Sequence, residues 1–147
     1  MNEPVELAYE KCRELISGCV VGRVAVSTPT GPRIVPVNYA VVDDAVVFRT
    51  TPYSLLGTYA WNTTLAFEID SIDYENQRGW SVVATGRGTM VEDRAELARI
   101  RSFWDPQPWV GGPRLLYIML RWDELTGRRI GAEWTYANEL PLRRAGV

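Results

Sequence analysis

The chain has 147 residues, of which 46% are apolar and 23% charged, and its net charge is -2. These values are typical of one folded domain, which we expect to span residues 1–147. There is no histidine and a single lysine, Lys11, which excludes histidine-activated nucleophiles and histidine-ligated zinc and leaves little room for Schiff-base chemistry. The slightly acidic charge argues against a nucleic-acid partner. No segment has the pattern of a signal peptide or a membrane span, so we expect a cytoplasmic protein with no membrane partner.

An amphipathic helix is predicted over residues 4–16, where apolar residues recur at nearly helical spacing. Pro4 suits the first turn of this helix, and Gly18 is a typical helix stop. Cys12 and Cys19 cannot form a tetrahedral metal site by themselves and do not form a Cys-x-x-Cys motif. We therefore expect both cysteines to be reduced and buried, and we predict no metal site.

Three strands are predicted next, over residues 22–28, 33–42 and 45–51, which are rich in valine and isoleucine. Residues 28–32 and 43–44 separate these strands and have the proline, glycine and aspartate composition of turns. A three-stranded meander is the natural interpretation of this stretch.

A short helix is predicted over residues 53–61, and strict alternation then indicates a strand over residues 64–70. One face of that strand is apolar, and the other carries Ala66, Glu68 and Asp70, which indicates a wet or functional face. The following strand, residues 79–92, contains Gly86 and Gly88. Glycines inside a strand predict a bulge or a sharp bend, which a closing barrel needs.

The last third of the chain predicts a helix over residues 94–104, an irregular loop over 105–113 and a strand over 114–122. Residues 127–134 are expected to pair as a hairpin partner, and residues 137–147 to form a poorly ordered tail. Sequential antiparallel strands with bends favour a mainly β, antiparallel barrel of about six strands, with short flanking helices.

Several motifs permit both a functional and a structural interpretation. The segment 86–88 has two of the three glycines of a dinucleotide fingerprint, and we favour the bulge. Arg128 and Arg129 follow a turn and form either an anion site or ordinary solvated charge. Trp109 lies in a loop rich in glycine and proline, where it either covers a planar ligand or simply packs.

The order of several short segments is the strongest functional signal in the chain. They are GRVAV (22–26), IVPVNY (34–39), VVFRT (46–50), AFEID (66–70), GWSVV (79–83), GR (86–87) and TGRRI (126–130). This ordered set resembles the pyridoxamine 5'-phosphate oxidase-like family of FMN-binding split barrels. It is most similar to the short, single-domain branch of that family that is often seen in actinobacteria.

The resemblance implies a six-stranded split β-barrel that forms a homodimer, with two FMN sites at the subunit interface. It places one group of residues along the flavin ring, a second beside the ribityl chain and the phosphate, and a third where a polar contact or a cover reaches the ring. The first group is Val35, Pro36, Val37 and Asn38; the second is Arg49, Thr50, Thr51 and Ser54; the third is Trp80, Ser81 and Trp109.

The chain departs from the family pattern at the phosphate. Leu55 and Leu56 stand where family members carry basic residues, and Asn38 stands where some members carry a lysine. A desolvated phosphate needs a paired cation. Three outcomes are therefore open: Arg49, with or without Arg33, holds the phosphate; the protein binds FMN weakly; or it uses a deazaflavin or no flavin.

Two classes of function follow from this reasoning. The first is a flavin-dependent oxidoreductase that acts on a small planar substrate, with FMN or a deazaflavin as cofactor and no assigned catalytic residue. The second is a cofactor-poor barrel that binds a small apolar ligand, in a pocket lined by Leu55, Leu56, Trp80 and Trp109.

Overall fold

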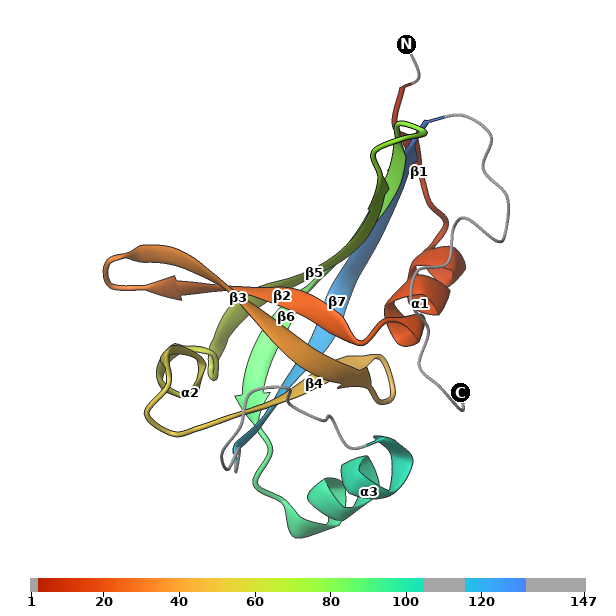
Figure 1. Cartoon of the computed structure of the whole chain (residues 1–147). Coiled ribbons are helices and arrows are strands. Elements are labelled where there is room, and N and C mark those ends of the chain that lie inside the picture. The colour runs from red at the N-terminus through yellow and green to blue at the C-terminus, as the bar shows by residue number, and fades with distance from the viewer. Residues whose placement is uncertain (1–2, 105–115, 132–147) are drawn as a thin grey trace.

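The computed structural model describes residues 3–104 and 116–131, and the chain folds into a mainly β structure (Figure 1). The elements in chain order are β1 (Val5–Glu6), α1 (Tyr9–Gly18), β2 (Val21–Thr28), β3 (Gly31–Val41), β4 (Ala45–Thr50), α2 (Leu55–Tyr59), β5 (Thr63–Asp73), β6 (Arg78–Met90), α3 (Arg94–Trp104) and β7 (Leu116–Ile130). No helix in these described ranges is long and apolar enough to cross a membrane.

All strand pairs are antiparallel, in the order β1-β7-β4-β3-β2-β5-β6, and a further pairing of β6 with β7 closes the ring. The long strands β2 to β7 form this ring, so the predicted antiparallel barrel is confirmed. The strand pairing is short at two junctions of the ring, between β2 and β5 and between β3 and β4, where three residue pairs join the strands. Between these two junctions the β2–β3 hairpin extends away from the rest of the barrel (Figure 1).

Two predicted elements differ from the structure at the ends of the chain. Residues 5–6 are not helical, because they pair with Arg128 and Arg129 at the outer edge of β7. The prediction of a separate hairpin partner starting at residue 127 is wrong. Strand β7 runs unbroken from Leu116 to Ile130, because it pairs with β6 along nearly its whole length.

The bend expected at Gly86 is confirmed as an irregularity in the pairing of β6 with β7. Register shifts between Thr85 and Gly86, so Asp123 on β7 has no partner residue on β6. A Cβ atom on residue 86 would lie 2.1 Å from the carbonyl oxygen of Arg121. Glycine therefore allows the two strands to approach closely where the barrel bends.

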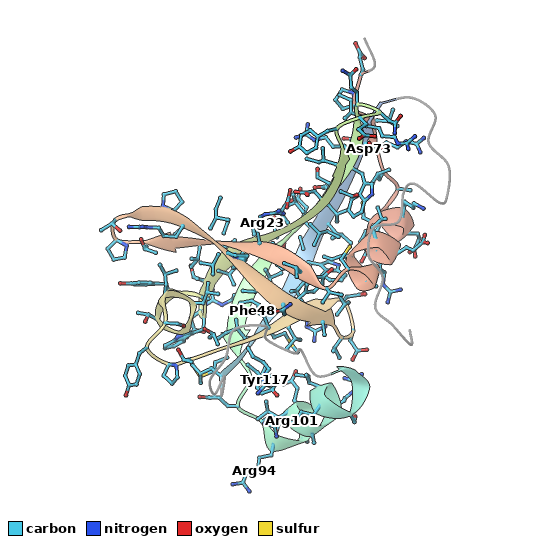
Figure 2. The ribbon with its side chains drawn as sticks, in the orientation of Figure 1. Arg23, Phe48, Asp73, Arg94, Arg101 and Tyr117 are labelled. Atoms are coloured by element: carbon cyan, nitrogen blue, oxygen red, sulfur yellow. The ribbon has the colours of Figure 1, made fainter. Side chains whose placement is uncertain are left out.

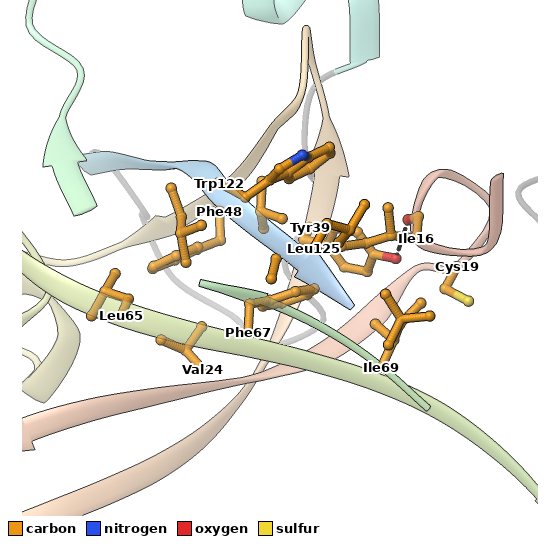
Figure 3. Packing of buried hydrophobic residues seen from close by; sticks show 14 of the residues in the cluster. Ile16, Cys19, Val24, Tyr39, Phe48, Leu65, Phe67, Ile69, Trp122 and Leu125 are labelled. Atoms are coloured by element: carbon orange, nitrogen blue, oxygen red, sulfur yellow. Dashed lines mark hydrogen bonds between the residues drawn. The ribbon is translucent and has the colours of Figure 1, made fainter. Parts of the chain in front are cut away.

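The interior of the barrel holds the main apolar core, with the ring of Tyr39 edge-on to that of Phe67 at 4.7 Å (Figure 3). The Tyr39 hydroxyl donates a hydrogen bond to the carbonyl of Ile16, which fixes α1 to the barrel. Cys12 and Cys19 are reduced and buried, as expected. A second cluster lies between α3 and the outer side of β4 and β7; its buried members are Val42, Ala45, Val47, Val91, Ile100, Tyr117 and Met119.

Candidate functional site

The structure divides the predicted site residues into two groups. Val35 to Asn38 lie on β3, close to the end of β4 with Arg49 and Thr50 and to the start of α2 at Ser54. Trp80 and Ser81 lie on β6, which β2 and β5 separate from β3. In the closed ring β3 and β6 are opposite strands, so the two groups lie on opposite walls of the barrel. Trp109 lies outside the described residues.

Strand β3 has an open edge from Gly31 to Val37. It pairs with β2 on one side over this stretch, whereas β4 joins its other side only from Tyr39 onward, and no other described strand pairs there. The amide of Tyr39 donates to Val20, so the odd-numbered residues face β2 and the even-numbered ones face the open edge. That edge therefore presents the N–H and C=O of Ile34 and the C=O of Pro36.

The hydroxyls of Thr50 and Ser54 are engaged within the protein. Ser54 Oγ donates to the Thr51 carbonyl at 2.8 Å and accepts from the amide of Gly57 at 3.0 Å, which caps α2. Thr50 Oγ1 lies 2.6 Å from Ser54 Oγ and must be the donor of that bond, because the single proton of Ser54 is already used. These hydroxyls hold the turn after β4 and leave no proton to donate to a phosphate.

Leu56 belongs to the barrel core, with 4% of its surface exposed, and Leu55 packs against the same core. The side chain of Leu56 therefore fills the end of the barrel, where it is not available to line a ligand pocket. Gly57 follows in α2, and a Cβ atom there would lie 2.0 Å from the Thr51 carbonyl oxygen. This close contact explains why α2 begins directly against the end of β4.

Arg49 and Arg101 converge on the buried ring of Tyr117. The guanidinium carbon of Arg49 lies 5.1 Å from the ring centroid, and that of Arg101, from α3, lies 5.3 Å from it. Arg101 Nε also donates to the Tyr117 hydroxyl at 3.3 Å. Asn38 comes directly before Tyr39, the first residue of β3 that pairs with β4, and by strand alternation it faces the same side as Arg49.

This cluster contains two predicted residues, Asn38 and Arg49, and two that the sequence did not indicate, Tyr117 and Arg101. The signal for Arg101 is weak: it directly follows Ile100, a buried residue of the helix predicted over residues 94–104. Arg33, which we also considered for a phosphate, is exposed and donates to Thr30 near the hairpin tip at 2.9 Å.

A cavity of about 580 Å³ lies along the far end of β5, β6 and β7. Ser81 on β6 lines this cavity between its two register partners, Asp70 on β5 and Arg128 on β7. Trp80 also lines the cavity, but the residue is only 3% exposed and belongs to the core. Its indole nitrogen is buried and has no hydrogen-bond partner in the described part of the chain.

An ionic cluster borders this cavity, on the strand face that alternation marked as wet. One guanidinium nitrogen of Arg23 donates to Glu68 at 3.0 Å and to Asp70 at 3.1 Å (Arg23 is labelled in Figure 2). Burial raises the pKa of Glu68 to about 7, and the neighbouring Asp70 adds to this rise while Arg23 opposes it. Glu68 is therefore partly protonated at neutral pH.

Known proteins match this chain over most of its length. Residues 9–129 match the family model described as pyridoxamine 5'-phosphate oxidase. The uncharacterized protein Rv0080 of Mycobacterium tuberculosis is 32% identical over 137 residues, which cover 90% of this chain and 89% of that protein.

Solved structures show the same similarity. A FAD binding protein from Mycobacterium smegmatis superposes with a TM-score of 0.73 at 26% identity, covering 87% of this chain and 99% of that one. A conserved protein of unknown function from Corynebacterium diphtheriae, DIP1874, has a TM-score of 0.69 at 26% identity, covering 88% and 98%. With a family match over most of its residues, the chain belongs to the pyridoxamine 5'-phosphate oxidase family.

Proposed function

We propose that this protein binds a flavin, FMN or FAD, and acts as a flavin-dependent oxidoreductase on a small planar substrate. Membership of the family and the similarity to the FAD binding protein of Mycobacterium smegmatis support this proposal. The observation that carries it is the open edge of β3 beside the end of β4.

The residues at and beside this edge suit the ring and the phosphate of a flavin. A flavin ring has hydrogen-bond donors and acceptors along its rim, and the backbone groups of Ile34 and Pro36 offer both kinds of partner. The proline at position 36 costs no ladder bond there, because its nitrogen faces the open edge. Arg49 supplies a positive charge for the phosphate. The hydroxyls of Thr50 and Ser54 do not bind it, since their protons are used in hydrogen bonds within the protein.

The composition of the chain suits a protein that leaves the redox chemistry to its cofactor. A bound flavin exchanges a hydride with a substrate that stacks on its ring, and needs no protein histidine to do so. The part of this chain is to bind the ring along β3, to hold the phosphate near Arg49 and to exclude water from the ring.

We further propose that the active form is a homodimer with its sites at the subunit interface. The separation of Ser81 from the β3 edge by two intervening strands supports this arrangement. A second copy can bring its own Ser81 to the first copy's β3 edge, whereas Trp80 is buried in the core of its own barrel. Light scattering after gel filtration tests the dimer directly, and a monomer at binding concentrations would contradict it.

The flavin proposal is tested by fluorescence titration of the protein with FMN and with FAD. Ile34→Pro removes the one amide donor at the open edge, and the alternating Pro32 and Pro36 show that the strand accommodates proline at even positions. Ile34→Ala is the matched control, because it removes the side chain and keeps that donor. We expect Ile34→Pro to weaken flavin binding about tenfold and Ile34→Ala to have a smaller effect.

Equal binding by the two variants would contradict the role of the β3 edge. Failure of the wild-type protein to bind FMN or FAD would contradict the proposed function itself. Binding of a deazaflavin in place of both would keep an oxidoreductase and reject the cofactors named here.

A further inference from the structure

We propose that the cavity of about 580 Å³ at the end of β5, β6 and β7 binds an aromatic carboxylate, with Arg128 and Ser81 holding its carboxylate group. Figure 2 labels Asp73 at this end of β5. The β3 edge of the same chain belongs to the opposite wall of the barrel. Binding at this cavity goes beyond the proposed function, because it can be measured without a flavin.

The shape of the cavity follows from the side chains of three neighbouring strands. Its floor is β6, which contributes the small residues Gly79 and Ser81. Gly79 lies in register between Ile72 of β5 and Ile130 of β7, and both isoleucines are exposed and line the cavity. Directly opposed residues of antiparallel strands point to the same side of a sheet. The strands that carry the two isoleucines run about 10 Å apart, and the glycine between them leaves a slot for a flat ring.

The next row of the same three strands is polar. Ser81 lies in register between Asp70 of β5 and Arg128 of β7, and all three residues line the cavity. Opposed side chains have Cβ atoms about 5 Å apart, so the Ser81 hydroxyl and the Arg128 guanidinium group can reach one carboxylate together. Neither of these two side chains has a hydrogen bond or an ion pair with another residue in the described part of the chain. A guanidinium group matches a carboxylate with two parallel N–H donors.

The acidic residues beside the cavity already have cationic partners. Asp70 accepts a hydrogen bond from Arg23 at 3.1 Å, and Asp73 accepts one from Arg78 at 3.1 Å. These bonds leave little negative charge to attract a cationic ligand. Asp70 nevertheless lies one strand away from Ser81, and its charge disfavours a dianion such as a phosphate ester more than a monoanion. The site is therefore suited to a single carboxylate.

Glu68 makes this site sensitive to pH. It lines the cavity and is faced by Arg23 of β2 and by Asp70 of its own strand, and its partner on β6 is Val83. Burial raises the pKa of Glu68 to about 7, so this group is mostly neutral at pH 6 and mostly charged at pH 8. A charged Glu68 repels a bound anion. We therefore expect the carboxylate to bind about threefold more weakly at pH 8 than at pH 6.

The test uses naphthoate as the probe and measures its binding by isothermal titration calorimetry at pH 6 and pH 8. Naphthamide has the same ring and no charge, so it reports on ring binding alone. Naphthyl phosphate has the same ring and is a dianion at pH 8. We expect naphthoate to bind about tenfold more tightly than naphthamide at pH 6, and more tightly than naphthyl phosphate at pH 8.

Five variants separate the parts of the site. Arg128→Gln should weaken naphthoate binding about tenfold and Ser81→Ala about threefold, with naphthamide affinity changed less than about twofold. Ile130→Ala should weaken both probes equally, because it removes one side of the slot. Glu68→Gln should bind naphthoate equally at pH 6 and pH 8. Arg87→Gln is the matched control, because Arg87 is exposed on β6 and does not line the cavity, and it should bind as the wild type does.

The indole N–H signals in an NMR spectrum locate the bound probe. Trp80 lines the cavity, and its indole nitrogen has no hydrogen-bond partner among the described residues. Trp61 and Trp122 donate to the Gly57 carbonyl at 2.9 Å and to the Tyr9 hydroxyl at 3.1 Å, away from the cavity. Naphthoate should shift the Trp80 signal, which its loss in Trp80→Phe identifies, and should leave the signals of Trp61 and Trp122 in place.

Several results would overturn the proposed site without touching flavin binding. Equal affinity for naphthoate and naphthamide, or unchanged naphthoate affinity in Arg128→Gln, would show that these residues do not recognise a carboxylate. Tighter binding of naphthyl phosphate than of naphthoate would reject the ligand class. A wild-type protein that binds no naphthoate at millimolar concentration would overturn the site altogether, and the flavin titrations decide the proposed function separately.

Discussion

The ionic cluster on the outer face of β5 predicts a pH-dependent stability that a single substitution removes. Burial raises the pKa of Glu68 from its ordinary 4.5 to about 7 in the folded protein. The folded state therefore binds more protons than the unfolded state between these two values. The free energy of unfolding then falls as pH rises from about 4.5 to about 7, and stays lowered above that. Glu68→Gln should remove this loss.

The magnitude follows from the size of the pKa change and from the exposure of the side chain. At about 1.4 kcal/mol for each pH unit, the full change corresponds to more than about 3 kcal/mol. The Glu68 side chain is 35% exposed, and solvent screening reduces such an effect strongly, so we expect about 1 kcal/mol. Relative to the wild type, Glu68→Gln should gain about this amount of stability between pH 5 and pH 8.

Urea unfolding followed by tryptophan fluorescence measures this difference at several pH values. Glu92→Gln is the matched control, because it makes the same change at an exposed position outside the ionic cluster. A constant difference for Glu68→Gln, or one that falls as pH rises, would refute the reasoning. A constant difference would mean that the bond from Arg23 balances burial and the charge of Asp70, and a falling one that it outweighs them.

Two further predictions concern the backbone contacts that shape the site. Gly88→Ala should destabilise the protein by about 2 kcal/mol in urea unfolding, because the new Cβ would lie 2.1 Å from the Ala60 carbonyl oxygen. Gly18→Ala is the control: a Cβ there has no neighbour within 4 Å, so stability should change by less than about 0.5 kcal/mol. Equal effects of the two substitutions would contradict this explanation. Ser54→Ala should lower the free energy of unfolding by about 1 to 2 kcal/mol in the same assay. The substitution removes the cap of α2 and the acceptor of the buried Thr50 hydroxyl. An unchanged free energy of unfolding would show that these hydroxyl hydrogen bonds do not stabilise the fold.

The strands, the helices after residue 53 and the bend at Gly86 could be predicted because their signals are local. Alternating burial, turn residues and glycines inside a strand are properties of neighbouring positions. The short strand at residues 5–6 and the unbroken course of β7 could not be predicted in this way. Both depend on which distant strand lies alongside, and the pairing of β6 with β7 decides the second.

The candidate site shows a similar division. The nearness of β3 to the end of β4 came from the resemblance and is present in the structure. The roles of individual side chains were less predictable. Thr50 and Ser54 use their protons on each other and on the turn, which depends on how α2 packs. Arg101 reaches Tyr117 because α3 docks on the sheet, and no local pattern specifies that docking.

The most direct test of the central claim is whether a flavin stays with the protein. The wild-type chain is incubated with FMN or with FAD and passed over a gel-filtration column, and the visible flavin absorption is followed. Our account predicts that this absorption elutes with the protein, at a size corresponding to two chains. Elution of all the flavin in the small-molecule fraction, for both compounds, would contradict it.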